Sequence, residues 1–255
     1  MKKEIGLVLS GGGTKGIAEA GVLQFLEEKK IFPNVIAGTS SGAIVGGLYS
    51  FGKSPLEILD FFKSVYFFNW KHFTFSKPGF INSDVFRLYL KPIIGEIKIK
   101  DLKTELLITA TDLVQGECFV FDGEDYLLDA IIASCAVPGL ASPHKRGDRL
   151  LSDGGILNNF PSDLLLDKCN KLIGVYVSPL QDVENNQLNS IKAVATRAYE
   201  LLSHSVENFK FQHCDWFISP KELSNYGMFE SKKTRMEEIF QLGYQEAEKT
   251  FSNNF

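Results

Sequence analysis

One serine of the sequence stands in a context typical of a catalytic nucleophile. Ser40 is the middle residue of a G-x-S-x-G pattern whose ends are Gly38 and Gly42. An apolar run at 35–37 precedes the pattern and a run of small and apolar residues at 43–48 follows it, so we expect a strand, a sharp turn and a helix. Such a turn strains the central residue and lifts its side chain clear of the sheet, while glycines on either side relieve crowding. Because so short a pattern also arises by chance, the interpretation requires a base and an oxyanion-binding group elsewhere in the chain.

A glycine-rich loop offers the oxyanion-binding group. It begins with Gly11, Gly12 and Gly13, continues through Lys15 and ends at Gly16, in the pattern G-x-G-x-x-G. Backbone N–H groups at the start of a helix bind negative oxygen, whether it belongs to a phosphate or to a tetrahedral intermediate. Dinucleotide binding needs an acidic residue at the end of the second strand, and a P-loop needs a G-K-[ST] sequence. The second strand is followed by no acidic residue, and no G-K-[ST] follows the glycine-rich loop at the required spacing. We therefore favour an oxyanion hole and keep a nucleotide-binding protein as the alternative.

Asp153 is the candidate base, followed by Gly154 and Gly155, which let other backbone approach its carboxylate closely. A serine, acid, histidine order, as in α/β-hydrolases, is also available, since His204 and His213 follow the aspartate. However, His204 falls within an expected helix and His213 ends it, and neither follows a strand. A histidine-dependent serine esterase or acyltransferase that uses the same serine therefore stays open as a second alternative.

Four ordered blocks, at 9–16 (LSGGGTKG), 38–42 (GTSSG), 133–139 (ASCAVPG) and 153–161 (DGGILNNFP), make the chain resemble the patatin-like phospholipases, bacterial lipid acyl hydrolases. The resemblance implies a dyad without histidine, in which Ser40 is the nucleophile and Asp153 the base. It also assigns the residues Gly11 to Gly13 to the oxyanion hole. Members of that family usually carry Arg where this chain has Lys15, which keeps the charge but lacks the bidentate fork.

A dyad of this kind makes specific physical demands. A carboxylate whose pKa is near 4 is a poor base for a hydroxyl, and it becomes useful where water is excluded and proton transfer accompanies attack. Most of the stabilisation must then come from the oxyanion donors, about 3 kcal/mol for each. Neither a metal nor a cofactor is required.

The composition fits one α/β domain over residues 1–255. Hydrophobic residues make up 44% of the chain and charged residues 23%, a balance that can bury a large core. The net charge of −4 gives no reason to expect nucleic acid as a partner. Four widely spaced cysteines indicate reduced thiols and no zinc site.

Hydrophobic patterning predicts the elements that position these groups. A strand, loop, helix, strand, elbow, helix opening implies a mostly parallel central sheet in a three-layer α/β/α fold. Strands are expected at 5–9, 35–39, 104–111, 117–121, 149–152 and 171–177, with 104–111 and 117–121 paired through the turn at 112–116. Helices are expected at 15–29, 40–51, 54 onward, 82–94 and 125–135, and Ser54 is the expected N-cap of the third, with Pro55 at its first position. Apolar helical stripes are expected at 191–209 and 236–251.

The expected activity is phospholipase A or lysophospholipase hydrolysis of a phospholipid, lysophospholipid or other fatty-acyl ester, through an acyl-serine intermediate. Nine aromatic residues between 61 and 80 suit either core packing or an acyl-chain wall or lid. The N-terminal apolar run is too short for a signal peptide and 35–51 too interrupted for a membrane span. We therefore expect a cytoplasmic protein, with peripheral membrane contact as an option, and leave the oligomeric state open.

Overall fold

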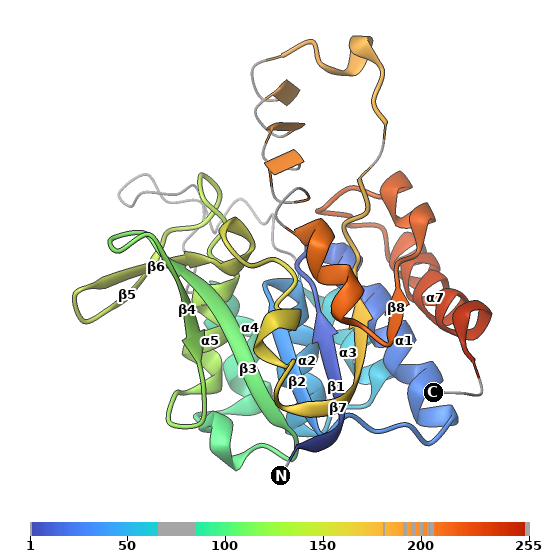
Figure 1. Ribbon diagram of the computed structural model, residues 1–255. Coiled ribbons are helices and arrows are strands. Elements are labelled where there is room, and N and C mark those ends of the chain that lie inside the picture. The colour runs from blue at the N-terminus through green and yellow to red at the C-terminus, as the bar shows by residue number, and fades with distance from the viewer. Residues whose placement is uncertain are drawn as a thin grey trace.

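A single mixed sheet forms the centre of the protein (Figure 1). The computed structural model describes residues 2–65, 85–180, 182–190, 193–194, 197–198, 201–202, 204 and 207–252. Its strands are β1 (Lys3–Leu9), β2 (Val35–Thr39), β3 (Glu105–Asp112), β4 (Glu117–Phe121), β5 (His144–Arg146), β6 (Arg149–Asp153), β7 (Cys169–Val175) and β8 (Trp216–Ile218). They run in the order β5-β6-β3-β2-β1-β7-β8, with β4 also paired to β3. Strands β3, β2, β1, β7 and β8 are neighbours in that order, and each of these pairs is parallel. Strands β4 and β6 pair antiparallel with β3, and β5 pairs antiparallel with β6.

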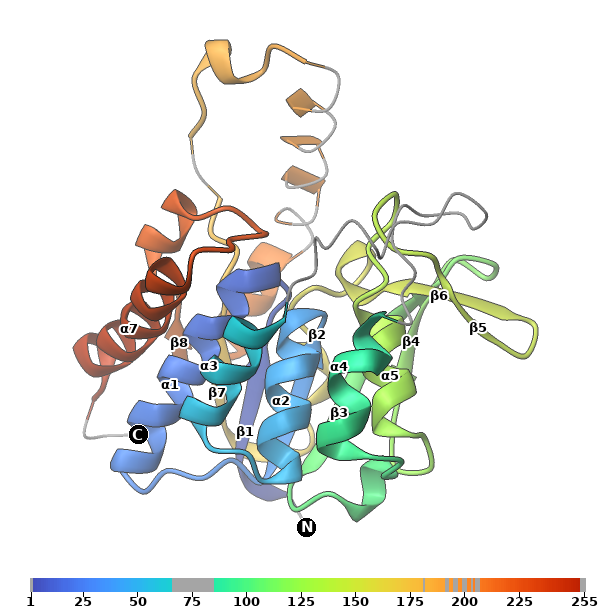
Figure 2. The same cartoon turned by 180° about the vertical axis from the view of Figure 1, so that it is seen from behind.

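Long helices cover one face of this sheet (Figure 2). They are α1 (Ile17–Glu28), α2 (Ser41–Phe51), α3 (Pro55–Ser64), α4 (Val85–Ile94) and α5 (Leu127–Ser134), while α7 (Lys233–Thr250) packs along α1. The opposite face carries shorter turns, η5 (Ser162–Leu164) and η7 (Asn208–His213) (Figure 1). The remaining 3₁₀ turns are η1 (Gly13–Gly16), η3 (Ile99–Asp101), η4 (Gly154–Ile156), η6 (Asn185–Gln187) and η8 (Lys221–Asn225).

The central strands β1 and β2 are largely apolar because both of their faces are covered. In β1, Leu7 and Leu9 are buried in the core under the long helices, whereas Val8 is buried on the opposite face with Phe160. Successive side chains of a strand point to opposite sides, so a strand buried on both faces reads as a continuous apolar run. The α/β class and the parallel centre expected from the sequence are confirmed.

Several local predictions are also confirmed. Strand β2 has the expected bounds, and β3 and β4 form the expected antiparallel pair. At the start of α3, the Ser54 hydroxyl accepts the Glu57 amide at 3.3 Å and the Glu57 carboxylate accepts the Ser54 amide at 2.9 Å, which is a capping box. Strand β7 ends two residues earlier than expected because the Val177 N–H donates to the Ser10 hydroxyl at 2.9 Å and not to a strand.

The expectation that the apolar residues at 191–209 form a buried helical stripe is wrong. Among the described residues of this stripe, Val194, Leu202 and Phe209 are exposed, and the described residues between 193 and 202 project away from the sheet (Figure 1). The stripe on α7 is confirmed, with Met236, Ile239, Phe240, Gly243 and Ala247 buried. Most of the aromatic stretch, from 66 to 80, lies outside the described residues. No helix in the described part of the chain is long and apolar enough to cross a membrane.

Candidate active site

Ser40 occupies a strained turn between β2 and α2. Its φ of 52° and ψ of −116° lie in a region that side-chain-bearing residues rarely adopt and that costs about 1–3 kcal/mol. Two neighbours at the end of α5 hold the turn. The Ser40 N–H donates to the Ser134 hydroxyl at 2.7 Å, and the Cys135 thiol donates to the Ser40 carbonyl at 3.3 Å. The backbone of the serine is therefore fixed on both sides.

The glycines of the elbow are required by close backbone approach. A Cβ on Gly38 would lie 2.5 Å from the Gly42 carbonyl oxygen, and one on Gly42 would collide with the Leu9 carbonyl oxygen. Because real Cβ atoms do not approach backbone so closely, strand β1, strand β2 and helix α2 meet at this point only when both positions are glycine. Gly16 lies against the Ser41 side chain, where a Cβ would be 2.6 Å from its Cβ.

Asp153 ends strand β6 and lies beside the elbow. Its N–H donates to the Ala136 carbonyl at 3.0 Å, and its Oδ1 accepts the Gly155 N–H at 2.7 Å. Gly154, between them, abuts Thr109 of β3 so closely that a Cβ there would lie 2.5 Å from the Thr109 hydroxyl. Contacts of both strand β6 and the turn that follows it therefore hold the aspartate in place.

Burial of Asp153 raises the pKa of its carboxyl to about 6, while hydrogen bonds from the Gly155 amide and the Ser40 side chain lower it. The Ser40 side chain is thus close enough to favour the charged form of the carboxyl, and both residues line the same pocket. Cys135, also close to this carboxylate, is buried, and its thiol pKa is raised well above the usual range by burial and by the negative charge of Asp153. The thiol is therefore neutral near pH 7 and no competing nucleophile.

The glycine-rich loop lies against the serine. A Cβ on Gly11 would be 3.2 Å from Ser40 Cβ. The Gly11 N–H, however, donates to the Asn159 carbonyl at 3.2 Å, so its expected role as an oxyanion donor is not supported, because the amide is already paired. Within the described residues, no acceptor is recorded for the N–H of Gly12 or Gly13. These two amides are the donors that the loop has available.

The conformation of the loop depends on a distant segment. Gly13 has a φ of 62°, in the left-handed region, and a Cβ there would collide with the Met228 carbonyl oxygen. That carbonyl accepts the Thr14 N–H at 2.8 Å. The segment before α7 therefore fixes the loop from outside, and nothing in the local sequence signals this contact.

A pocket of about 330 Å³ opens over the serine, the aspartate and the glycine-rich loop. Its wall is largely apolar and comes from separate segments, including Ile44, Phe62, Phe86, Leu140, Leu180 and Met228. Lys15 and Arg197 are the cations that line it. The described residues that line the pocket include no histidine.

The histidines considered as a third catalytic group lie elsewhere. His213 Nδ1 is 2.8 Å from the Ser162 hydroxyl, and His204 packs on the Tyr176 ring with centroids 6.2 Å apart. Neither lines the pocket of Ser40, so the geometry offers no support for a histidine-dependent triad. The described residues contain no group of three or more side chains that could hold a metal ion.

A mixed sheet with a parallel centre, a glycine-rich loop after its first strand and a strained serine after its second define an α/β protein of the nucleophile-elbow class. The family model described as Patatin-like phospholipase matches residues 7–166, which include both Ser40 and Asp153. The chain belongs to the patatin-like phospholipase family.

Similar proteins agree with this assignment. A protein named as an uncharacterized NTE family protein of Mycobacterium tuberculosis is 33% identical over 194 residues, which are 71% of this chain and 52% of that protein. Lysophospholipase NTE1 of Candida glabrata is 28% identical over 190 residues, 70% of this chain and 11% of that one. The chain thus spans about half the length of the mycobacterial relative.

A solved structure supports the fold. VipD from Legionella pneumophila superimposes with a TM-score of 0.64, covering 98% of this chain and 66% of that one, at 15% sequence identity. At that identity the likeness concerns the arrangement of helices and strands alone.

Proposed function

We propose that this chain hydrolyses carboxylic esters of lipids, with Ser40 as nucleophile and Asp153 as base. The observation that carries the proposal is a strained serine and a buried carboxyl that line the same largely apolar pocket, where the serine side chain favours the charged carboxylate. Membership of the patatin-like phospholipase family supports it, as does the lysophospholipase among its relatives.

In the acylation step, the Asp153 carboxylate accepts the proton of the Ser40 hydroxyl as its oxygen attacks the ester carbonyl. The tetrahedral oxyanion receives hydrogen bonds from the N–H groups of Gly12 and Gly13. The carboxylic acid then gives its proton to the departing alkoxide, which leaves as an alcohol, and the acyl group stays on the serine. Water activated by the same carboxylate completes hydrolysis and restores both groups.

The burial of Asp153 gives the dyad its base strength. A pKa of about 6 makes this carboxylate a stronger base than an exposed one, while leaving it ionised at neutral pH. No imidazole is needed under these conditions, since most of the transition-state stabilisation comes from the loop amides.

The apolar wall favours a fatty-acyl chain as the group that enters the pocket. Side chains such as Leu140, Leu180 and Phe86 line it, and apolar contact with a chain contributes about 0.8 kcal/mol for each methylene buried. We therefore propose phospholipase A or lysophospholipase activity as the specific form.

A panel of phospholipid, lysophospholipid and p-nitrophenyl esters tests the proposal. Ser40→Ala and Asp153→Asn should each reduce hydrolysis by more than about a thousandfold, whereas Asp148→Asn, an exposed aspartate on the β5–β6 turn, serves as the matched control. Full activity of Asp153→Asn would show the dyad assignment to be wrong. Loss of activity in His204→Ala or His213→Ala would instead favour a histidine-dependent enzyme.

A further inference from the structure

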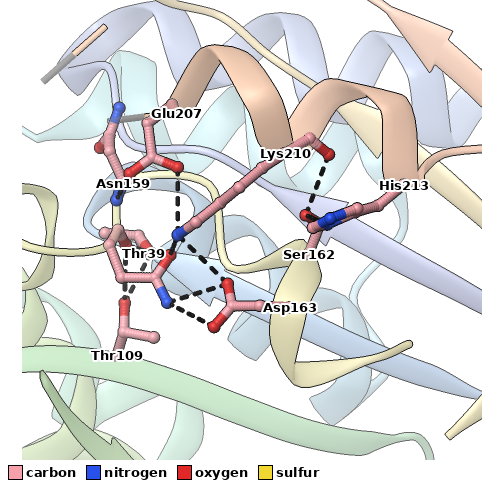
Figure 3. Close-up of polar contacts among 9 residues, drawn as sticks. Thr39, Thr109, Asn159, Ser162, Asp163, Glu207, Lys210 and His213 are labelled. Carbon is pink, nitrogen blue, oxygen red and sulfur yellow. Dashed lines mark hydrogen bonds and ion pairs between the residues drawn. The ribbon is translucent and has the colours of Figure 1, made fainter. Parts of the chain in front are cut away.

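A buried ion pair lies at the start of η7, where Glu207 precedes the turn and Lys210 is part of it (Figure 3). Glu207 and Lys210 are 1% and 6% exposed, and the Lys210 ammonium is 3.4 Å from Glu207 Oε2. The same ammonium is 2.7 Å from Asn158 Oδ1 and 3.2 Å from Asp163 Oδ1. Buried charges are costly and are retained only where they are well paired, so this pair needs a reason. Both residues lie outside the family-matching residues 7–166.

One branch leads from Glu207 to the glycine-rich loop. Glu207 Oε1 accepts the Asn159 N–H at 2.8 Å. The Asn159 carbonyl in turn accepts the Gly11 N–H at 3.2 Å, and its side-chain Nδ2 donates to the Gly11 carbonyl at 3.4 Å. Asn159 therefore holds both backbone groups of Gly11, and Glu207 holds Asn159.

A second branch leads from Lys210 to the strand ends. Lys210 binds the side-chain oxygen of Asn158, and the backbone carbonyl of the same residue accepts the Thr39 hydroxyl at 2.8 Å. Thr39 directly precedes the serine. The Asn158 N–H donates to the Gly154 carbonyl at 2.8 Å, directly after the aspartate. The ion pair is thus linked, through these two consecutive asparagines, to the glycine-rich loop, to the residue before the serine and to the residue after the aspartate.

We propose that Glu207 is a positioning residue that fixes the oxyanion-binding loop through Asn159, with Lys210 holding its carboxylate in place. This inference rests on the proposed function, because it takes the N–H groups of Gly12 and Gly13 as the oxyanion donors. Because Gly11 is held at both its N–H and its carbonyl, the N–H groups of Gly12 and Gly13 keep a fixed orientation. An oxyanion donor must be positioned within a few tenths of an ångström to be effective.

A merely structural ion pair makes a different prediction. Its loss lowers the free energy of unfolding but leaves the turnover of the remaining folded enzyme unchanged. Loss of a positioning residue lowers kcat with little change in KM, since the oxyanion forms only in the transition state. It also weakens binding of a trifluoromethyl ketone, which forms an oxyanion adduct with the serine, in proportion to kcat.

The experiment compares Glu207→Ala, Glu207→Gln and the matched control Asp112→Asn, each well below its own Tm. Asp112 is buried and paired with Arg149 at 2.8 Å, and it does not line the pocket, so its variant breaks a buried ion pair elsewhere. We expect Glu207→Ala to lower kcat on a short p-nitrophenyl ester about 10- to 100-fold, with KM within about twofold. Glu207→Gln keeps an oxygen for the Asn159 N–H but loses the ion pair with Lys210, so we expect an intermediate kcat loss of about three- to tenfold. This variant tests the inference if the alanine variant does not fold.

Two outcomes overturn the inference separately from the proposed function. If Ser40→Ala abolishes hydrolysis but both Glu207 variants keep kcat within twofold of wild type, the positioning role is wrong and the dyad stands. An equal kcat loss in Asp112→Asn would likewise mark the effect as one of stability. Activity that survives Ser40→Ala overturns both proposals.

Discussion

At the scale of single residues, Asp153 is the group whose environment most changes its chemistry. The residue is 4% exposed, and burial raises the pKa of its carboxyl to about 6. A buried aspartate without these neighbours would favour the protonated form even more, since the Gly155 amide and the Ser40 hydroxyl oppose the rise. These opposing effects leave a carboxyl that is ionised at neutral pH and whose pKa lies only slightly below neutral pH.

This balance predicts the acid limb of the pH profile. Because the base must be deprotonated, kcat/KM on a soluble ester should fall about tenfold for each pH unit below 6 and level off above about 7. Stopped or continuous assays from pH 4.5 to 8.5 measure the limb directly. A limb near pH 4, typical of an exposed aspartate, would contradict the assigned environment.

A second buried carboxyl, Glu19 in the first turn of α1, has no catalytic role in this account. It is fully buried, and burial raises its pKa well above the usual range, with only the Ser10 backbone opposing the rise. Below pH 4.5 the side chain is neutral in both states. As pH rises from there toward the folded-state pKa, the unfolded chain releases the proton more readily, so the free energy of unfolding falls.

Glu19→Gln should therefore raise Tm at pH 7 to 8 and leave it nearly unchanged at pH 4.5. A gain of about 1 kcal/mol corresponds to a rise of about 2–4 °C in a chain of this size. Thermal unfolding at the two pH values checks this, and Glu28→Gln, on the exposed end of the same helix, is the control. An equal shift at both pH values would exclude the linkage.

At the scale of elements, the end of α5 contacts both strands that lead to the proposed catalytic residues. Ser134 and Cys135 hold the turn after β2, while the Ala136 carbonyl accepts the Asp153 N–H and the Ser152 hydroxyl from β6, at 3.0 and 2.6 Å. The strained conformation of Ser40 is stable because several elements impose it at once.

That strain predicts an unusual order of stability among inactive variants. Ser40→Gly relieves the positive φ, whereas Ser40→Ala keeps it. After allowing for the larger unfolded-state entropy of glycine, we expect Ser40→Gly to have the higher free energy of unfolding by about 1 kcal/mol. Urea denaturation of both variants provides the comparison. If the alanine variant is the more stable, the turn is not strained.

The sequence predicts most elements that carry a clear hydrophobic period and misses the short ones. Strand β2 and the long helices follow from continuous or helical patterns, and the cap of α3 from Ser54 and Pro55. Strands β5 and β8 have three residues each, too few for a period to be visible. They form because neighbouring strands offer free hydrogen-bonding edges.

At the scale of the whole molecule, the pocket is assembled from segments far apart in sequence. The proposed catalytic pair and the loop glycines each lie in a local pattern, and Asn159 falls within the block at 153–161. The contacts that Asn159, Met228 and Glu207 make are not predictable from the sequence. Their contributions are backbone or buried contacts that exist only once β6, η7 and the segment before α7 are packed together. No local pattern of residue types encodes such contacts.

The apolar wall of the pocket predicts that esters with long acyl chains are preferred over those with short ones. Leu180→Ser removes apolar contact from the pocket, so hydrolysis of a C16 ester should lose about 1 kcal/mol of transition-state binding, about fivefold in kcat/KM, while a C4 ester is nearly unaffected. Leu113→Ser, at a similarly exposed leucine that does not line the pocket, is the control. Equal losses on both esters would argue against an acyl-chain wall.

The central claim is that Ser40 is activated by Asp153. Labelling with a fluorophosphonate, followed by intact mass and peptide mapping, tests it most directly, because the reagent requires an activated serine but not the natural lipid. We predict a single adduct on Ser40 whose rate of formation falls below pH 6 and drops by more than about a hundredfold in Asp153→Asn. An adduct on another residue, or labelling of Asp153→Asn at the wild-type rate, would contradict the account.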